Sequence, residues 1–243
     1  MLPAIFPEFN PRYPLPVRDN VDFVNQLDDE AATDSELFKE CPEILQDFAD
    51  IIGGEYKVQR KTVFFKPKKA GSPKLSLVES SSAVRSLLDI GFYLRHRARK
   101  GDLLMIDEPE LNLHPANQRR VARLLARLVN WGVRVFVTTH SDYIAKELNT
   151  LLLLSRLDAV AIKKHGYRPE EALRSEQVRL HIAHLKLVRR SQSAKRSSPQ
   201  NVIEPVPPLE DGGFAYSSFD DTIEHMNHVQ REVWDEVSAK EEP

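Results

Sequence analysis

Residues 101–115, GDLLMIDEPELNLHP, constrain this chain most, because an apolar run ends there in two adjacent carboxylates. The run is short and does not alternate with polar residues, which is typical of a buried strand in a parallel sheet. Asp107 and Glu108 therefore leave the strand at its carboxyl end, the edge where open α/β folds bind ligands. One carboxylate there can hold magnesium, and its neighbour can orient a water molecule for attack on a phosphate. A plain turn or helix cap is the alternative.

A second predicted strand, residues 133–139 (VRVFVTT), brings His140 to the same edge of the sheet. A histidine at that place can donate a hydrogen bond to a phosphate oxygen, although a strand-end histidine can also be an ordinary surface or core residue. Apolar spacing predicts helices on both sides of this strand, over residues 115–131 and 142–148. Strands and helices therefore alternate, which favours an α/β fold with a parallel sheet.

The rest of the chain divides into further predicted elements. Before residue 101 the patterns predict a helix over 34–52, a strand over 56–67, a short strand near 75–79 that makes a hairpin, and a helix over 82–99. After residue 154 they predict strands over 158–164 and 178–188, an exposed basic loop over 189–200, a Pro-rich strand with a turn over 201–213, and a helix over 219–237. We group these into three regions, residues 1–74, 75–155 and 156–243, with the basic loop in the last.

Composition narrows the classes of protein further. The formal net charge of −2 gives no overall attraction to nucleic acid or membrane, and the single cysteine, Cys41, excludes an internal disulfide. The N-terminus lacks a signal-peptide pattern and the apolar runs are short, so we expect a cytoplasmic protein without a membrane span. Residues 178–199 hold six Lys or Arg and no acid, which fits either phosphate contacts with nucleic acid or a solvated loop.

The two strand-end motifs resemble a known family. LLMIDEPELNLHP followed by VFVTTHSDYIAKEL is similar to the ABC-type ATPase heads of SMC, RecF and OLD-like proteins, in the group of "AAA family" ATPases. The resemblance implies a partial P-loop NTPase sheet with flanking helices and a small C-terminal β/α extension. It also implies ATP and Mg²⁺ as cofactors, with Asp107 as the magnesium carboxylate, Glu108 as the catalytic glutamate and His140 as the switch histidine.

The resemblance further implies residues that meet a second ATPase head. Residues 110–114, which end in His114, match the loop that crosses the dimer interface. ESSSAVRSL, residues 79–87, occupies the place of the signature sequence, where Ser81 and Ser82 would meet the γ-phosphate of ATP held by the opposite subunit. Ala83 stands where this family usually has glycine, and a plain helix N-cap is the alternative for the serines.

One expected element is missing from the sequence. No GxxxxGK[ST] loop is present to hold the phosphates, and the glycines at Gly53, Gly54 and Gly71 have neither its spacing nor its lysine. We therefore expect the C-terminal lobe of an ATPase that forms a dimer with itself or with a P-loop-containing chain and drives a DNA-related or defence partner. The alternative is a non-catalytic dimerisation or regulatory module. A metal-dependent hydrolase unrelated to ATP ranks last.

Overall fold

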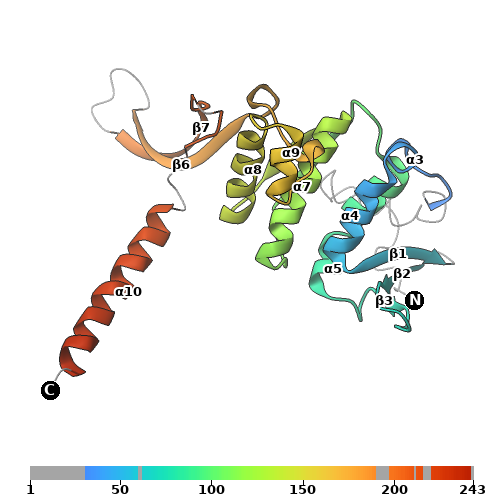
Figure 1. Ribbon diagram of the computed structural model, residues 1–243, viewed down its shortest axis with the longest axis horizontal. Helices are drawn as coiled ribbons and strands as arrows, with labels where there is room; N and C mark the ends of the chain where they lie inside the picture. Colours follow the sequence, from blue (N-terminus) through green and yellow to red (C-terminus); the bar gives the residue numbers. More distant parts are fainter. Residues whose placement is uncertain (1–30, 60–61, 190–196, 211, 216–219, 242–243) are drawn as a thin grey trace. The chain divides into compact units, whose positions relative to one another are not determined.

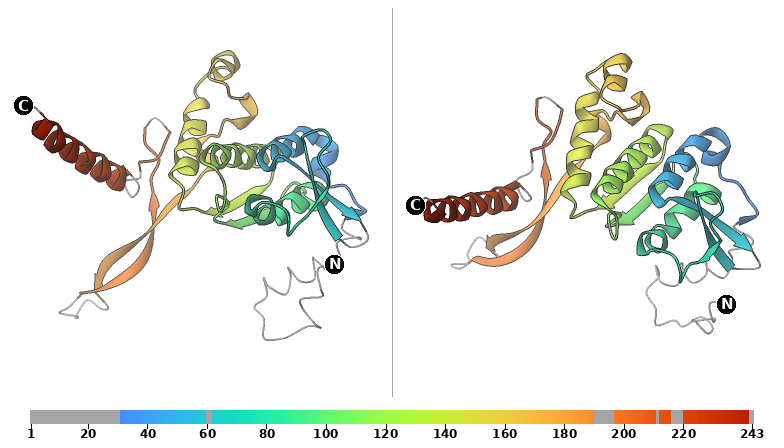
Figure 2. Two further views of the ribbon diagram at one scale, coloured as in Figure 1. Left: turned by 90° about the horizontal axis from the view of Figure 1, so that it is seen from below. Right: turned by 60° about the horizontal axis from the view of Figure 1, so that its bottom comes forward.

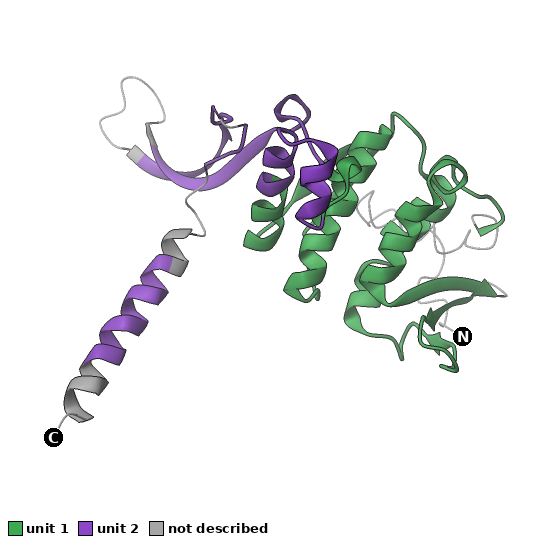
Figure 3. Cartoon of the chain, in the orientation of Figure 1, with its two compact units in different colours: residues 1–148, 167–171 green, residues 149–166, 172–243 purple. Residues whose placement is uncertain are grey.

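The computed structural model describes residues 31–59, 62–189, 197–210, 212–215 and 220–241 (Figure 1). The chain divides into two compact units (Figure 3). The first consists of Met1–Leu148 and Tyr167–Glu171, and the second consists of Asn149–Gly166 and Ala172–Pro243. The elements of the first unit are α3 (Glu36–Glu40), α4 (Pro42–Ile52), β1 (Gly54–Gln59), β2 (Thr62–Pro67), β3 (Leu75–Ser76), α5 (Ser82–Ser86), α6 (Leu88–Phe92), η1 (Tyr93–Arg97), β4 (Leu103–Asp107), α7 (Pro115–Trp131), β5 (Arg134–Thr138) and η2 (Pro169–Glu171). Those that lie in the second unit, or enter it, are α8 (Asp142–Leu154), α9 (Ala159–Lys164), η3 (Ser175–Gln177), β6 (Leu180–Arg189), β7 (Ser197–Val206) and α10 (Asp220–Glu241).

The helix predicted over residues 34–52 is two helices, α3 and α4. Ser35 begins the first, and its hydroxyl oxygen accepts a hydrogen bond from the Phe38 N–H at 2.9 Å. Pro42 occupies the first turn of α4, where its missing N–H costs nothing, so a new helix begins after Cys41. Gly53 ends α4 with φ 74°, the left-handed conformation that glycine adopts without a steric penalty.

The antiparallel sheet has the order β1-β2-β3. The single strand predicted over residues 56–67 is wrong, because β1 and β2 are separate strands that pair with each other. Residues 60–61 between them lie outside the described residues. The inward side chains stand at even-numbered positions in β1, such as Tyr56 and Val58, and at odd-numbered positions in β2, Val63 and Phe65, so the alternation changes phase where the chain reverses. The predicted hairpin to the third strand is confirmed, since β3 pairs antiparallel with β2.

The helix predicted over residues 82–99 is divided into α5, α6 and the π-helical turn η1. Gly91 in α6 lies against aromatic side chains of the core. A Cβ atom on it would come 2.6 Å from Tyr56 Cε2 and 2.8 Å from Phe48 Cε1. This close approach explains why glycine is tolerated inside a helix, where it normally lowers stability.

We expect Gly91→Ala to lower the free energy of unfolding by about 1–3 kcal/mol, the usual cost of overpacking a well-filled core. The two aromatic rings must move to admit the methyl group, and this cost exceeds the gain in helix propensity. Urea unfolding measures the effect. Lys39→Ala, an exposed change in α3, serves as control and should stay within about 0.5 kcal/mol of the wild type. A stabilised Gly91→Ala variant would contradict the packing argument.

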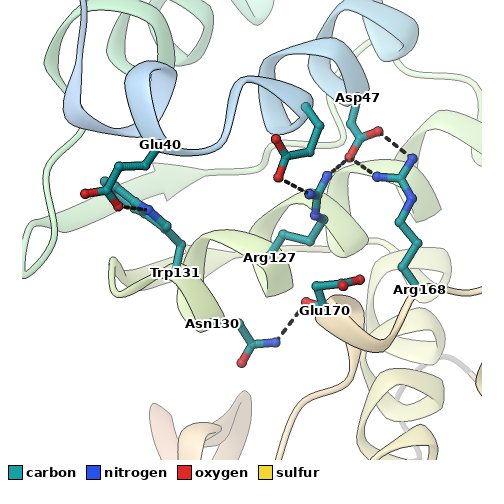
Figure 4. Close-up of polar contacts among 8 residues, drawn as sticks. Glu40, Asp47, Arg127, Asn130, Trp131, Arg168 and Glu170 are labelled. Carbon is teal, nitrogen blue, oxygen red and sulfur yellow. Dashed lines mark hydrogen bonds and ion pairs between the residues drawn. The ribbon is translucent and has the colours of Figure 1, made fainter. Parts of the chain in front are cut away.

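Helices α4 and α7 are joined by charged side chains as well as by apolar packing (Figure 4). Arg127 on α7 is only 6% exposed, and its guanidinium group donates to Glu43 Oε1 at 3.2 Å and to Asp47 Oδ2. Arg168 donates to the two carboxylate oxygens of Asp47 at 2.9 and 3.0 Å. Arg127 therefore holds the two helices together through two carboxylates, one of which a second arginine shares.

The parallel pair of strands, β4 and β5, aligns Met105 with Phe136 and is covered on one face by apolar side chains of the core, several of them from α7. The opposite face is open. On it Leu103, Met105 and Phe136 are 55%, 65% and 54% exposed. The prediction of fully buried strands is wrong for this face, because the three apolar side chains on it are left more than half exposed by the segments that pack around the sheet.

The second unit contains the β6–β7 ribbon and the closing helix α10, both shown in Figure 2. Those two strands and this helix were predicted, but the strand predicted over residues 158–164 is wrong. That segment is helix α9, because Asp158 caps it and its carboxylate accepts from the Ala161 N–H at 2.8 Å. The predicted loop over 189–200 is too long, since β6 ends at Arg189 and β7 begins at Ser197. Residues 190–196 lie outside the described residues.

Among the helices that the structure describes, none combines the length and the apolar character needed to cross a membrane.

Candidate functional site

The carboxyl ends of β4 and β5 bring a carboxylate and a hydroxyl together. The two strands are in register to their last residues, so Asp107 lies opposite Thr138. The hydroxyl of Thr138 donates a hydrogen bond to Asp107 Oδ1. Both residues are exposed and lie on the open face of the sheet, on the same side as Met105 and Phe136. The bond orients the Asp107 carboxylate at the edge of the sheet.

Glu108 follows the strand in an uncommon backbone conformation. Its φ is 48°, in the left-handed region that few residues other than glycine adopt. Its N–H donates to the Thr138 carbonyl oxygen at 3.0 Å and to Thr138 Oγ1 at 3.3 Å, so β5 holds the backbone of the strained residue. Residues kept in sparsely populated conformations cluster at functional sites. The turn that follows is closed by the Leu111 N–H, which donates to the Glu108 carbonyl oxygen at 3.1 Å.

His140 lies beside Glu108, as the sequence predicts. Its Nε2 is 3.6 Å from Glu108 Oε1, which is beyond the length of a direct hydrogen bond. The imidazole is 83% exposed, so it can turn toward a ligand at this edge. Its backbone is fixed instead, because the His140 N–H donates to Glu110 Oε1 at 2.7 Å. The two strand ends therefore place two carboxylates and an imidazole at one edge of the sheet.

The other predicted residues lie on helix ends. His114 begins α7, and its Nδ1 accepts from the Ala116 N–H at 3.2 Å. Ser81 begins α5, and its hydroxyl oxygen accepts from the Val84 N–H at 3.3 Å. Ser82 is the first residue of α5 and is exposed. The helix-cap alternative therefore holds for Ser81.

The two serines are not part of the cluster at the strand ends. Within the described residues, no hydrogen bond or ion pair joins Ser81 or Ser82 to Asp107, Glu108 or His140. Helix α5 is linked instead to the predicted interface loop, since the Ser86 hydroxyl donates to the Leu111 carbonyl oxygen at 3.3 Å. The role of the serines toward an opposite subunit stays a prediction.

Sequence reasoning missed the positioning roles of Thr138 and Glu110. Thr138 is the last residue of β5, and a register count of the two parallel strands would have placed it opposite Asp107. Glu110 was assigned only to the interface loop, and its bond to the His140 backbone crosses 30 residues of sequence. Nothing in the local pattern signals that contact, because it depends on how the two loops fold over the edge of the sheet.

The donor set at this edge decides which metal chemistry fits. Among the described residues, no group of three or more His, Cys, Asp or Glu side chains could enclose a metal ion. Magnesium, however, is commonly held by one or two carboxylates together with phosphate oxygens and water. The exposed Asp107 therefore fits a magnesium ion that arrives with a nucleotide, and the edge does not fit a metal centre made of protein ligands alone.

Comparison with known proteins identifies the family. The AAA ATPase domain matches residues 19–145, which is just over half of the chain, so the chain belongs to this family. Its class is therefore that of ATP-binding, ATPase-like proteins. The predicted resemblance and the α/β class with a small parallel sheet and flanking helices are confirmed.

The chain was also compared with curated proteins and with solved structures. No curated protein matches the chain. Among the solved structures that match is an SMC ATPase from a study of ATP-driven dimerization and DNA-stimulated activation of SMC ATPases. It is 13% identical, with a TM-score of 0.36, and the match covers 78% of this chain and 89% of that one.

Proposed function

We propose that this chain supplies the magnesium and water-activating side of an ATP-hydrolysing site, and that a different polypeptide segment supplies the phosphate-binding loop. The observation that carries the proposal is the strand-end cluster, where Glu108 and His140 lie 3.6 Å apart beside the Asp107–Thr138 pair. Membership of the AAA ATPase family supports ATP as the nucleotide. The 243 residues contain no GxxxxGK[ST] motif, so the phosphates need another source of backbone amides and lysine.

Each residue at the edge has a distinct task in this proposal. Asp107, oriented by the Thr138 hydroxyl, holds the magnesium ion. Glu108 orients the attacking water and accepts its proton, since a positioned carboxylate is a general base of the required kind. His140 donates a hydrogen bond to a γ-phosphate oxygen, and Glu110 fixes the backbone from which it does so. Magnesium, when bound, neutralises charge that develops on the phosphates.

The open face of the parallel sheet supports the proposal that another polypeptide segment packs against it. Parallel sheets are normally covered on both faces, yet Leu103, Met105 and Phe136 are exposed here. Asp107 lies at the end of the same face, so a segment that covered it would also approach the magnesium residue. We propose that the segment that carries the phosphate-binding loop packs there. In the same proposal, a second ATPase head contacts Ser81, Ser82 and His114. Contact with DNA also stays a proposal.

We expect this chain alone to bind ATP with a dissociation constant above about 1 mM, because the phosphate-binding amides and lysine are missing. A dissociation constant of about 1 mM corresponds to a binding free energy of about 4 kcal/mol. Its hydrolysis rate should equal the uncatalysed background. Isothermal titration calorimetry with ATP and magnesium measures the affinity. Micromolar binding by the isolated chain would contradict the proposed division of the site.

The proposal is tested by finding and adding the missing segment. Sequencing the DNA upstream of the Met1 codon and in the neighbouring genes identifies GxxxxGK[ST] segments to produce together with this chain. Phosphate release should appear only in the joint complex, and Asp107→Asn should abolish it. Asp34→Asn, which removes an exposed carboxylate paired with Arg95, is the matched control and should leave the rate unchanged. Hydrolysis that survives Asp107→Asn would overturn the assigned magnesium role.

A further inference from the structure

The β6–β7 ribbon of the second unit offers a second candidate surface. Ten residue pairs run from Leu180 opposite Val206 to Arg189 opposite Ser197. Within the described residues, no third strand pairs with either side (Figure 2). A two-stranded hairpin is marginally stable in water, and a third strand or a packed face is normally needed. The ribbon therefore has the form of an incomplete sheet.

The two faces of the ribbon differ in chemistry. On one face Leu185, Leu187 and Ile203 are 68%, 70% and 72% exposed. On the other face, the carboxylate of Glu204 accepts a hydrogen bond from Lys186 Nζ, and its Oε2 lies 3.2 Å from His184 Nε2. Two basic residues, Lys186 and His184, therefore share a single carboxylate on that face. A strand added to the ribbon would meet an apolar face and a basic face.

The two edges of the ribbon differ as well. Pro199 and Pro205 lie in β7, and proline has no N–H to donate to a strand partner. Prolines inside a sheet are confined to positions whose N–H side points away from the partner strand. The outer edge of β7 therefore lacks two of its donors. Their opposite residues, Leu187 and His181, must then direct their own N–H groups outward from β6.

The outer edge of β6 keeps its donors. The positions at two-residue spacing from His181 to Leu187 include Ala183 and Leu185, and none of these residues is proline. Edges of this kind are templates for an added strand, whereas prolines are a common means of blocking an edge. The ribbon is blocked on the β7 side and open on the β6 side.

We propose that the open edge of β6 binds an extended segment of a partner protein in which apolar and acidic residues alternate. Added strands gain affinity from main-chain hydrogen bonds and specificity from alternate side chains. The apolar residues of the segment would join Leu185 and Leu187, and its acidic residues would face His184 and Lys186. A second copy of β6 is a poorer partner, because the strand contains Lys186 and Arg189 and no acid, and like charges across strands repel.

The test uses the complete chain and a fluorescein-labelled ten-residue peptide of alternating Val and Glu, with a Val–Lys peptide for comparison. Fluorescence anisotropy should show binding of the Val–Glu peptide that weakens with added salt. Ala183→Pro removes one outward N–H of β6 while keeping an apolar side chain, and it should weaken binding by about tenfold or more, at least about 1.4 kcal/mol. Asn201→Pro, the matched change on the already blocked β7 edge, should leave binding within about twofold, or about 0.4 kcal/mol. Circular dichroism verifies that both variants keep the ribbon.

Four results would overturn the proposal. Equal loss of binding in the two proline variants would mean that the β6 edge is not the site. Equal binding of the Val–Lys peptide would remove the charge argument. A dimer in sedimentation that Ala183→Pro dissociates would identify a second copy as the partner, and release of the Val–Glu peptide by duplex DNA at low salt would identify nucleic acid. None of these measurements involves ATP, so their outcome is independent of the proposed ATPase function.

Discussion

Glu108→Gln is expected to lower the rate of ATP hydrolysis by the joint complex by about 10²–10⁴-fold, the usual contribution of a positioned general base. Glutamine keeps the size of the side chain but cannot accept a proton from water. The variant should retain bound ATP, because Asp107 and the phosphate-binding segment are unchanged. Phosphate release measures the rate and filter binding measures the retained nucleotide.

The control for this variant is Glu55→Gln, which changes an exposed glutamate of β1 paired with Lys57. It should hydrolyse ATP at the wild-type rate. If Glu108→Gln were silent while substitutions at His114 broke the association with a second head, the chain would be a dimerisation or regulatory module. That outcome would exclude the catalytic proposal and leave the family membership intact.

Arg127→Ala is expected to lower the free energy of unfolding by about 3 kcal/mol. The side chain is 6% exposed and joins α7 to Glu43 and Asp47 on α4 (Figure 4). Removing one partner of a buried ion pair commonly costs about 3–5 kcal/mol. The lower end applies here, because Glu43 is 55% exposed and Arg168 continues to pair with Asp47. Urea unfolding of the complete chain measures the change.

Arg120→Ala supplies the comparison on the same helix. Arg120 is exposed, and its guanidinium group donates to Asn117 Oδ1 at 3.2 Å within α7. Its loss should change stability by about 0.5 kcal/mol or less. Equal effects of the two substitutions would mean that the buried pair contributes no more than an exposed arginine.

The local patterns around the candidate site were sufficient to predict its elements. The apolar runs before Asp107 and His140 predict the two strands, and α7 extends from Pro115 to Trp131 as its apolar spacing indicates. Short apolar runs that alternate with amphipathic helices leave few alternatives to a parallel sheet. The shared edge for the two carboxylates and the imidazole then follows from the parallel order of the strands.

Other parts could not be predicted because their patterns are shared by different structures. Residues 159–164 contain β-branched and apolar residues that suit a strand, but a cap at Asp158 and tertiary context produce helix α9. The sequence at the reversal between β1 and β2, residues 59–62, holds no Gly, Pro, Asn or Asp as a turn signal, and the change of phase from Tyr56 and Val58 to Val63 and Phe65 is a weaker mark of it. In both places local propensity is a weak guide, since packing selects between conformations of similar intrinsic stability.

The sequence by itself determined the α/β class, the strand-end cluster of Asp107, Glu108 and His140, and the family that these motifs resemble. Only the tertiary structure decided what surrounds them: the Thr138 hydroxyl on Asp107, the Glu110 carboxylate on the His140 backbone, and the open faces of two sheets. The physical reason is range. Strands and helices follow from periodicity within a few residues, whereas these contacts join positions about 30 residues apart, and a face is open or covered according to which segments pack on it.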